Sequence, residues 1–204
     1  GTVYGKEEIH RLAEIAKKHG LYIISDEVYR EFIYDGQTHT SILSVEGIEE
    51  HAIMVDSVSK RYSACGARIG CIVSRNKELM DATLKFAQAR LCPPTVDQLA
   101  AQACTKLGDE YFKEIIDEYQ ARRDVVYSAL MEIPGVVCKR PEGAFYVLAK
   151  LPIDDAEDFV IWLLDEFQVN GETVMGAPAE GFYATPGLGK NEIRRAYIIN
   201  NDCL

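Results

Sequence analysis

Short apolar runs follow an amphipathic segment in the first part of the chain. Over residues 6–19, apolar residues recur at helical spacing, acidic residues stand in the first turn, and Gly20 follows as a C-terminal stop. Residues 21–24, 52–55 and 71–73 form three short, continuously apolar runs. A run without alternation is typical of a strand buried on both faces. The pattern therefore predicts an α/β fold in which helices cover a sheet.

The middle of the chain favours helix. Residues 77–131 carry helical patterning, with interruptions predicted at 93–94, where two prolines stand together, and at 108–109. The stretch 110–131 is long and highly charged. Such a segment suits a helix that connects two domains.

The pattern changes again beyond Gly135. The expected elements are a strand at 143–148, an amphipathic helix at 156–167 and a final strand at 195–199. Together with the preceding patterns, these elements predict two domains. The first spans 1–115, and a smaller α+β domain spans 116–204.

Composition and charge narrow the possible partners. The 204 residues are 48% hydrophobic and 26% charged, which is ordinary for a globular protein and argues against disorder. The formal net charge of −10 disfavours non-specific binding to nucleic acid or to an anionic membrane, because both need a basic face. Small anionic substrates stay possible, since a local basic pocket does not show in the sum.

The cysteines do not form a recognisable site. The six cysteines are residues 65, 71, 92, 104, 138 and 203. They form no CxxC pair and do not cluster with the four histidines, so we expect neither a zinc site nor a disulfide scaffold. With no visible signal peptide or membrane-spanning run, the sequence predicts reduced thiols and a cytoplasmic location.

Polar side chains directly follow the predicted strand 21–24. Asp26 and Tyr29 stand three residues apart in the segment 25–29. Ligands of open α/β sheets bind beyond the carboxyl ends of the strands. Asp26 is therefore either an ordinary cap of the next segment or a buried carboxylate that faces a cationic ligand group, with the Tyr29 hydroxyl beside it.

A second polar segment follows the predicted strand 52–55. Lys60 stands in a serine-rich loop that also contains Ser57, and Arg68 follows eight residues later. A lysine in such a loop is usually solvated. Alternatively, burial and nearby cations lower its pKa and make it a Schiff-base nucleophile. Serine hydroxyls and an arginine are good phosphate ligands.

The third polar segment lies near the C-terminus, at 191–197. Arg194 and Arg195 are adjacent there, and for Arg195 we expect a solvated face or a salt bridge. Arg194, placed at the mouth of the last predicted strand, is instead a candidate to bind a carboxylate through two hydrogen bonds. Such a charge-assisted contact contributes about 1.5–3 kcal/mol.

Taken together, the motifs resemble those of the fold type I aminotransferases, class I and II. The opening Gly-Thr-Val-Tyr resembles the family's Asn-Pro-Thr-Gly segment with its first three residues missing. Segment 25–29 is similar to the cofactor aspartate and tyrosine motif, and 57–60, with the downstream Gly-x-Arg-x-Gly, to the lysine signature. Residues 143–146 and 191–197 match motifs of the family's small domain. The resemblance covers essentially the whole chain, in order.

The resemblance implies pyridoxal 5'-phosphate as the cofactor and a role for each matching residue. Lys60 would bind the cofactor as a Schiff base and move the proton at the substrate's α-carbon. Asp26 would pair with the protonated pyridine nitrogen and keep the ring an electron sink. Tyr29 would donate a hydrogen bond to the phenolic oxygen of the cofactor.

The remaining matches imply anion-binding roles. Ser57 and Arg68 would hold the cofactor phosphate, and Ser59 would assist them. Arg194 would receive the α-carboxylate of the substrate. Arg90 lies before the proline break, and we expect it to form a structural salt bridge rather than belong to the site.

The resemblance also implies the reaction and the partners. We expect transamination between an amino acid and a 2-oxo acid, with aspartate and 2-oxoglutarate as the first candidates, in a homodimeric enzyme. The implied fold is part of the aminotransferase large domain, with a mixed, mainly parallel sheet covered by helices, plus the smaller α+β domain. The family's N-terminal half is absent from this sequence, so we expect an inactive fragment of an active parent.

Three other interpretations stay open. A carbon–sulfur lyase or an aminocyclopropane-carboxylate synthase on the same scaffold shares the same residue types. A non-catalytic, aminotransferase-like domain of a regulator would sense the cofactor without turnover. The third alternative, a plain α/β domain with accidental motifs, requires every ordered match to be coincidental.

Overall fold

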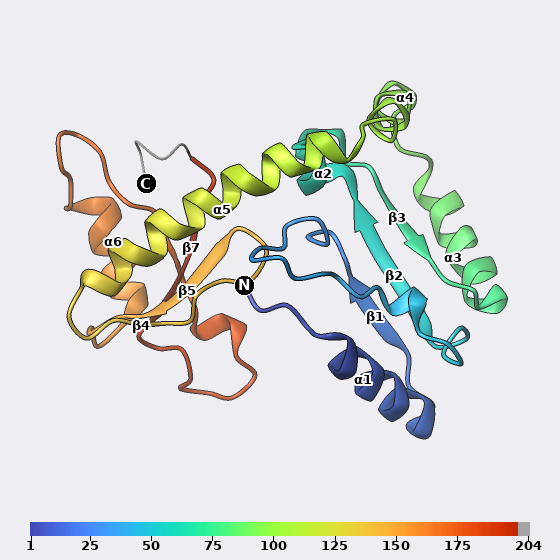
Figure 1. Ribbon diagram of the computed structural model, residues 1–204, viewed down its shortest axis with the longest axis horizontal. Coiled ribbons are helices and arrows are strands. Elements are labelled where there is room, and N and C mark those ends of the chain that lie inside the picture. Colours follow the sequence, from blue (N-terminus) through green and yellow to red (C-terminus); the bar gives the residue numbers. More distant parts are fainter. Residues whose placement is uncertain (200–204) are drawn as a thin grey trace. The chain divides into compact units, whose positions relative to one another are not determined.

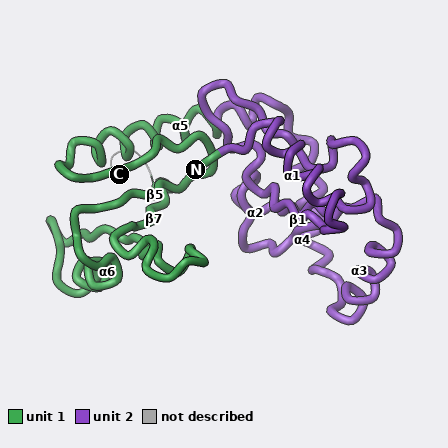
Figure 2. The backbone as a smooth tube through the Cα atoms, turned by 90° about the horizontal axis from the view of Figure 1, so that it is seen from below, with its two compact units in different colours: residues 1–2, 115–204 green, residues 3–114 purple. Residues whose placement is uncertain are grey.

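The computed structural model describes residues 1–199, in which the elements follow one another as drawn in Figure 1. Cys203 therefore lies outside the described residues. The chain divides into two compact units (Figure 2). The first unit consists of residues 3–114, and the second consists of residues 1–2 together with the residues from 115 onward. The division falls inside the long helix α5 (Asp109–Glu132), beside the boundary expected after residue 115. Identifying the units as a cofactor-binding and a small domain stays a prediction.

The first unit, 3–114, is built on a three-stranded mixed sheet. Its strands are β1 (Ile23–Asp26), β2 (Ala52–Ser57) and β3 (Gly70–Val73), in the order β1-β2-β3. Strands β1 and β2 are parallel, and β2 and β3 are antiparallel. This arrangement confirms the α/β class with a mixed sheet.

Helices connect and flank these strands. They are α1 (Lys6–His19), α2 (Val58–Arg61), α3 (Lys77–Arg90) and α4 (Thr95–Cys104), with the 3-10 turns η1 (Ile42–Ser44) and η2 (Cys65–Ala67). Helix α1 has the predicted bounds because the residues expected to start and to stop it adopt the capping geometry of a helix end. The Glu8 carboxylate accepts a hydrogen bond from the Gly5 amide at 2.7 Å, and Gly20 takes a left-handed φ of 64°.

The core of this unit covers only one face of the sheet. It is formed by α1, the segment 42–48 and β2, and its buried residues are Ala13, Ala16, Ile42, Val45, Ile48, Ala52 and Met54. On β1, burial alternates, so that Ile24 is 70% exposed, and all four residues of β3 are exposed. The expectation of strands buried on both faces is therefore wrong for β1 and β3, because the residues of this unit pack against one side of β1.

The second unit carries a four-stranded antiparallel sheet in the order β4-β5-β7-β6. Its elements are β4 (Val137–Cys138), β5 (Tyr146–Lys150), α6 (Ala156–Asp165), β6 (Ala177–Pro178), η3 (Glu180–Phe182) and β7 (Glu192–Ala196). The strand expected at 143–148 begins later, and the strand expected at 195–199 begins and ends earlier. In both cases, pairing between β5 and β7, from Tyr146↔Ala196 to Lys150↔Glu192, sets the bounds.

Helix α5 is tied to the segments next to this sheet by two arginine hydrogen bonds, one buried and one exposed. The Arg123 side chain is fully buried, and its Nη1 donates to the carbonyl of Pro141 at 2.5 Å. The Arg122 Nη1 donates to the carbonyl of Ile198 at 2.7 Å.

Between residues 1 and 199, no helix has the length and apolar character needed to cross a membrane.

Candidate active site

The first unit contains a cavity of about 270 Å³ where β1 and β2 end. It is lined by Asp26, Val28, Val55, Asp56, Ser57, Ser59, Lys60, Cys65 and Arg68. Parallel strands end at the same edge of a sheet, so the two polar segments that follow them meet there. The cavity thus brings together five of the residues that the sequence analysis singled out.

Asp26 and its neighbour Glu27 point to opposite sides. Asp26 is the last residue of β1, and its side chain is exposed at the cavity, where Oδ1 accepts a hydrogen bond from the Val28 amide at 3.2 Å. The buried carboxylate is instead Glu27, which is 2% exposed. Of the two interpretations of Asp26, the structure of this chain agrees with a cap of the next segment and not with a buried carboxylate, because alternation along the strand directs Asp26 away from the core.

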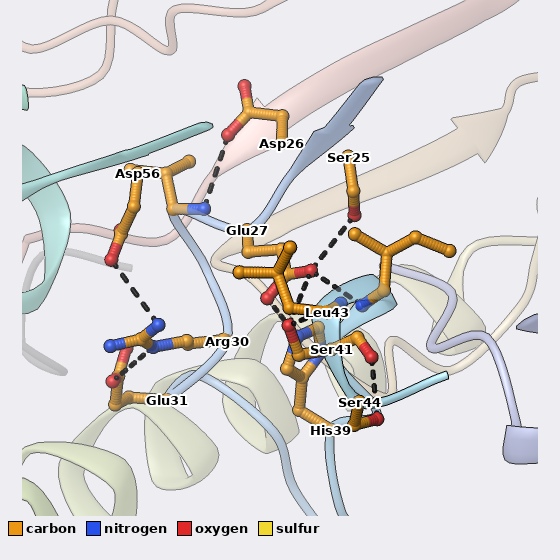
Figure 3. Close-up of polar contacts among 12 residues, drawn as sticks. Ser25, Asp26, Glu27, Arg30, Glu31, His39, Ser41, Leu43, Ser44 and Asp56 are labelled. Atoms are coloured by element: carbon orange, nitrogen blue, oxygen red, sulfur yellow. Dashed lines mark hydrogen bonds and ion pairs between the residues drawn. The ribbon is translucent and has the colours of Figure 1, made fainter. Parts of the chain in front are cut away.

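Glu27 anchors the turn that follows Asp26 (Figure 3). Its Oε1 accepts hydrogen bonds from the Ile42 amide at 2.9 Å and from the Ser41 hydroxyl at 3.0 Å, and its Oε2 lies 2.9 Å from His39 Nε2. Burial raises the pKa of Glu27, but the hydrogen bonds from His39, Ile42 and Ser41 outweigh burial and leave the pKa below its ordinary value. The carboxylate is therefore held in its charged form.

Tyr29 does not line the cavity. Its ring packs edge-on against Phe32, with centroids 6.2 Å apart and an interplanar angle of 72°. Its contact with a cofactor therefore stays a prediction.

Ser57 joins β2 to the helix that carries Lys60. Its hydroxyl oxygen accepts the Ser59 amide at 3.0 Å and so caps α2. Its single proton is donated to the carbonyl of Ile69 at 3.0 Å, so the 2.7 Å contact between the two serine hydroxyls is a donation from Ser59 to Ser57. Ser59 can turn its proton toward an anion in the cavity without breaking the link between Ser57 and Ile69.

Arg68 and Lys60 supply the positive charge of the cavity. Lys60 lies in the four-residue helix α2, and both side chains line the cavity. Arg68 takes a left-handed φ of 56°, and its Nη1 donates to the carbonyl of Cys65 at 3.1 Å. A non-glycine residue in that region costs on the order of 1 kcal/mol, a strain that is common where a side chain must be aimed at a ligand.

Gly70 allows the close approach of β3 to β2 beside the cavity. It is paired with Ser57 in the antiparallel register, and a Cβ at this position would lie 2.8 Å from the carbonyl oxygen of Asp56. A side chain here would have to displace the backbone that carries Ser57.

Asp56 is a cavity residue that the sequence analysis did not single out. Its side chain is 9% exposed, and its Oδ2 lies 2.7 Å from Arg61 Nη2 and 3.4 Å from Arg30 Nη1. The available signal was its position at the end of a strand, directly before Ser57. Its two arginine partners follow Tyr29 and Lys60 in the sequence, and the contact of Asp56 with Arg30 joins residues that are distant in the sequence.

Arg194 belongs to the second unit, where aromatic rings cover it. It lies in the middle of β7, opposite Leu148 on β5, so its expected place at the mouth of the strand is wrong. Its guanidinium lies 4.7 Å from the ring centroid of Tyr146 and 4.5 Å from that of Phe182. Within residues 1–199, no carboxylate lies at ion-pair distance from it. An arginine held in this way can bind a carboxylate ligand.

Two further arginines behave differently from Arg194. Arg195 borders an apolar cavity of about 220 Å³ that also contains Val147 and Phe159, and burial lowers its pKa. It is therefore not on a fully solvated face.

Arg90, at the end of α3, is exposed and forms no ion pair among residues 1–199, so the expected salt bridge is absent there. In the same part of the chain, no group of three or more His, Cys, Asp or Glu side chains is placed to hold a metal ion.

The arrangement agrees with comparisons to known proteins. The chain is 31% identical to the aspartate aminotransferase of Bacillus subtilis, with 100% of this chain and 51% of that protein covered. It is 34% identical to the aspartate aminotransferase of Sulfolobus acidocaldarius, with 100% and 50% covered. The crystal structure of an aromatic aminotransferase from Pyrococcus horikoshii superposes with a TM-score of 0.85 at 30% identity, over 99% of this chain and 53% of that one.

These relatives also show how much of the fold is present. The chain spans about half the length of the curated relatives it matches. The family model described as Aminotransferase class I and II matches residues 1–179, a range that includes the whole cavity at the ends of β1 and β2. With the ordered motifs, the mixed sheet and these matches in agreement, the chain belongs to the class I and II aminotransferase family.

Proposed function

We propose that the complete protein is a pyridoxal-phosphate-dependent aminotransferase. The observation that carries the proposal is the cavity that unites Asp26, Ser57, Ser59, Lys60 and Arg68 from three segments of the first unit. Each of these side chains suits one functional group of the cofactor. An amine suits the aldehyde, a carboxylate suits the pyridinium nitrogen, and two hydroxyls with a guanidinium suit the phosphate.

When bound, pyridoxal phosphate supplies an electron sink for the α-carbon of an amino acid. Lys60 Nζ holds the cofactor and then moves a proton at that carbon. Asp26 keeps the ring nitrogen protonated by favouring its cationic form. Tyr29 orients the ring through its hydroxyl, and Arg68 holds the phosphate together with the two serines.

The proposed substrates are an amino acid and a 2-oxo acid, with aspartate and 2-oxoglutarate first. The choice is supported by the aspartate aminotransferases of Bacillus subtilis and Sulfolobus acidocaldarius, the relatives described above. Arg194 receives the α-carboxylate. The proposal is supported by the rings of Tyr146 and Phe182, which hold the guanidinium in place by cation–π contacts and leave its N–H groups able to bind a carboxylate.

The complete protein is proposed to be a cytoplasmic homodimer, and the present chain is proposed to be inactive alone. The relatives are about twice as long, so half of their residues have no counterpart here. The exposed side of β1, where Ile24 is 70% exposed and Asp26 lies, fits a sheet face that further residues of the fold cover. The free thiols of the five cysteines in the described part of the chain fit a reducing compartment.

Two alternatives use the same residues. A lyase or synthase on this fold would release ammonia or a sulfur compound rather than exchange an amino group with a 2-oxo acid. A non-catalytic sensor would bind the cofactor and show no turnover. Measurement of 2-oxo acid exchange and of the release of ammonia or a sulfur compound by the complete protein separates the three.

The direct test is borohydride reduction with pyridoxal phosphate, followed by peptide mass mapping, on this chain and on the complete protein. We expect a phosphopyridoxyl group confined to Lys60 in the complete protein. The same label in the shorter chain would mean that the half-site is preorganised. No label in either would refute the aminotransferase function.

A further inference from the structure

Four charged side chains form a closed ring of alternating charge beside the cavity. Arg30 Nε lies 3.0 Å from Glu31 Oε1, and Arg61 Nε lies 3.1 Å from Glu31 Oε2. Asp56 Oδ2 closes the ring at 2.7 Å from Arg61 Nη2 and 3.4 Å from Arg30 Nη1. The two positive guanidinium charges and the two negative carboxylate charges of the ring sum to zero. Figure 3 shows the contacts of Arg30 with Glu31 and with Asp56.

The contact between Arg61 and Asp56 is the strongest part of the ring. These two side chains are 11% and 9% exposed, whereas Arg30 is 33% exposed, so water screens the pair least. Their contact is also a hydrogen bond. By contrast, Arg61 Nε and Glu31 Oε2 attract by charge alone, because the N–H is not directed at the oxygen.

The ring connects the two segments that carry the proposed cofactor ligands Tyr29, Ser57 and Lys60. Arg30 follows Tyr29, Arg61 follows Lys60, and Asp56 precedes Ser57. Asp56 Oδ1 also accepts the Ser57 amide at 2.7 Å. The carboxylate that Arg61 binds is therefore the one that orients the serine at the start of α2.

The ring also controls the charge of the cavity. Asp56 lines the same cavity as Arg68 and Lys60. An uncompensated carboxylate there would repel an anion as strongly charged as a phosphate. Arg30 and Arg61, which lie beside the cavity, neutralise the negative charge of Asp56. The positive charges of Lys60 and Arg68 therefore dominate inside the cavity.

We propose that the ring is a positioning device for phosphate binding, in which Arg61 acts through Asp56 to hold Ser57 and to cancel the carboxylate charge beside the anion. The proposal rests on the proposed function, since the anion is the phosphate of pyridoxal phosphate. Arg30, Glu31 and Arg61 do not line the cavity, so they act on the ligand only through other residues.

The test compares the binding of pyridoxal phosphate and of pyridoxal, which lacks the phosphate, to the complete protein by absorbance titration. Arg61→Met is expected to weaken pyridoxal phosphate binding by about tenfold or more, because it leaves a charge unpaired, and to affect pyridoxal much less. The double variant Asp56→Asn/Arg61→Met should recover part of the loss, because the repelling charge is gone. Arg61→Lys keeps the charge and should stay near the wild type.

The matched control is Lys77→Met, which breaks an exposed ion pair with Asp81 on α3 of the same unit and should change neither affinity. If Arg61→Met fails to fold, Arg30→Met gives the same comparison at the most exposed corner of the ring, with a smaller expected loss.

Each remaining outcome has a definite meaning. If the wild type binds pyridoxal phosphate and Arg61→Met binds it equally well, the role of the ring is wrong and the proposed function stands. The same conclusion follows if both ligands lose affinity equally, or if the double variant is no better than Arg61→Met. A wild type that binds neither ligand overturns the proposed function and the role of the ring together.

Discussion

Glu27 Oε2 and His39 Nε2 lie 2.9 Å apart, and the Glu27 carboxylate is buried, while the carboxylate of the preceding residue, Asp26, is exposed at the cavity. Two adjacent acids therefore have different tasks. Glu27 fixes the turn after β1 by binding His39, Ser41 and the Ile42 amide. The turn after β1 is thus already ordered, so the proposed contact of Asp26 with the cofactor would not require the turn to become ordered on binding.

Glu27 predicts a pH dependence of stability. Its pKa is lowered in the folded chain, so its contribution is present above the ordinary carboxyl pKa and is lost as the pH falls through the lowered value. The free energy of unfolding of the wild type should therefore fall more steeply between about pH 6 and pH 3 than that of Glu27→Gln. Urea unfolding at a series of pH values measures this, with Glu14→Gln on the exposed side of α1 as the control. Equal slopes for Glu27→Gln and the wild type would contradict the prediction.

Substitution of the two adjacent acids should separate stability from activity. Glu27→Gln should lower the free energy of unfolding by roughly 1–3 kcal/mol, because a buried hydrogen-bonding network loses its charged acceptor. Asp26→Asn should leave the stability of the present chain nearly unchanged, because the side chain is exposed there, but should abolish transamination by the complete protein. Thermal unfolding and an amino-group exchange assay on both variants provide the measurement. Near-native activity of Asp26→Asn would refute the role assigned to Asp26.

The close approach at Gly70 can be tested with a matched glycine. Gly70→Ala places a Cβ 2.8 Å from the Asp56 carbonyl and should cost about 1–3 kcal/mol and weaken pyridoxal phosphate binding, because the Ser57 backbone must shift. Gly66→Ala is the control, since its Cβ would meet nothing within 4 Å. Melting temperatures and cofactor titrations of both variants report the result. Similar behaviour of the two would show that the β2–β3 spacing does not hold the site.

The aromatic cover of Arg194 predicts a graded loss of substrate binding in the complete protein. Arg194→Lys removes the planar fork and should raise KM by about 10- to 100-fold. Phe182→Leu removes one of the two rings and should raise KM only a few-fold. Steady-state kinetics with the amino acid varied provide the measurement, and Lys150→Met, exposed at the end of β5, is the control. An unchanged KM in Arg194→Lys would exclude this arginine as the carboxylate ligand.

Local signals in the sequence were sufficient for several elements. The helix Lys6–His19 has the predicted bounds because its apolar period, its acidic first turn and Gly20 all act within a few residues. The polar segments after β1 and β2 meet at one cavity, because parallel strands place their carboxyl ends at one edge of the sheet. Strand bounds in the second unit were displaced, because the pairing of β5 with β7 sets them over a long sequence distance.

The sequence by itself determined which residue types and motifs the chain brings to the cavity, and in what order. Only the tertiary structure decided which of Asp26 and Glu27 faces the core, that Arg61 cancels the charge of Asp56, and that Phe182 covers Arg194. The reason is physical. Alternation along a strand dictates that neighbours point to opposite faces, but the packing of α1 and of the segment 42–48 decides which face is buried. Ion pairs and ring contacts likewise depend on distances in space that no local pattern encodes.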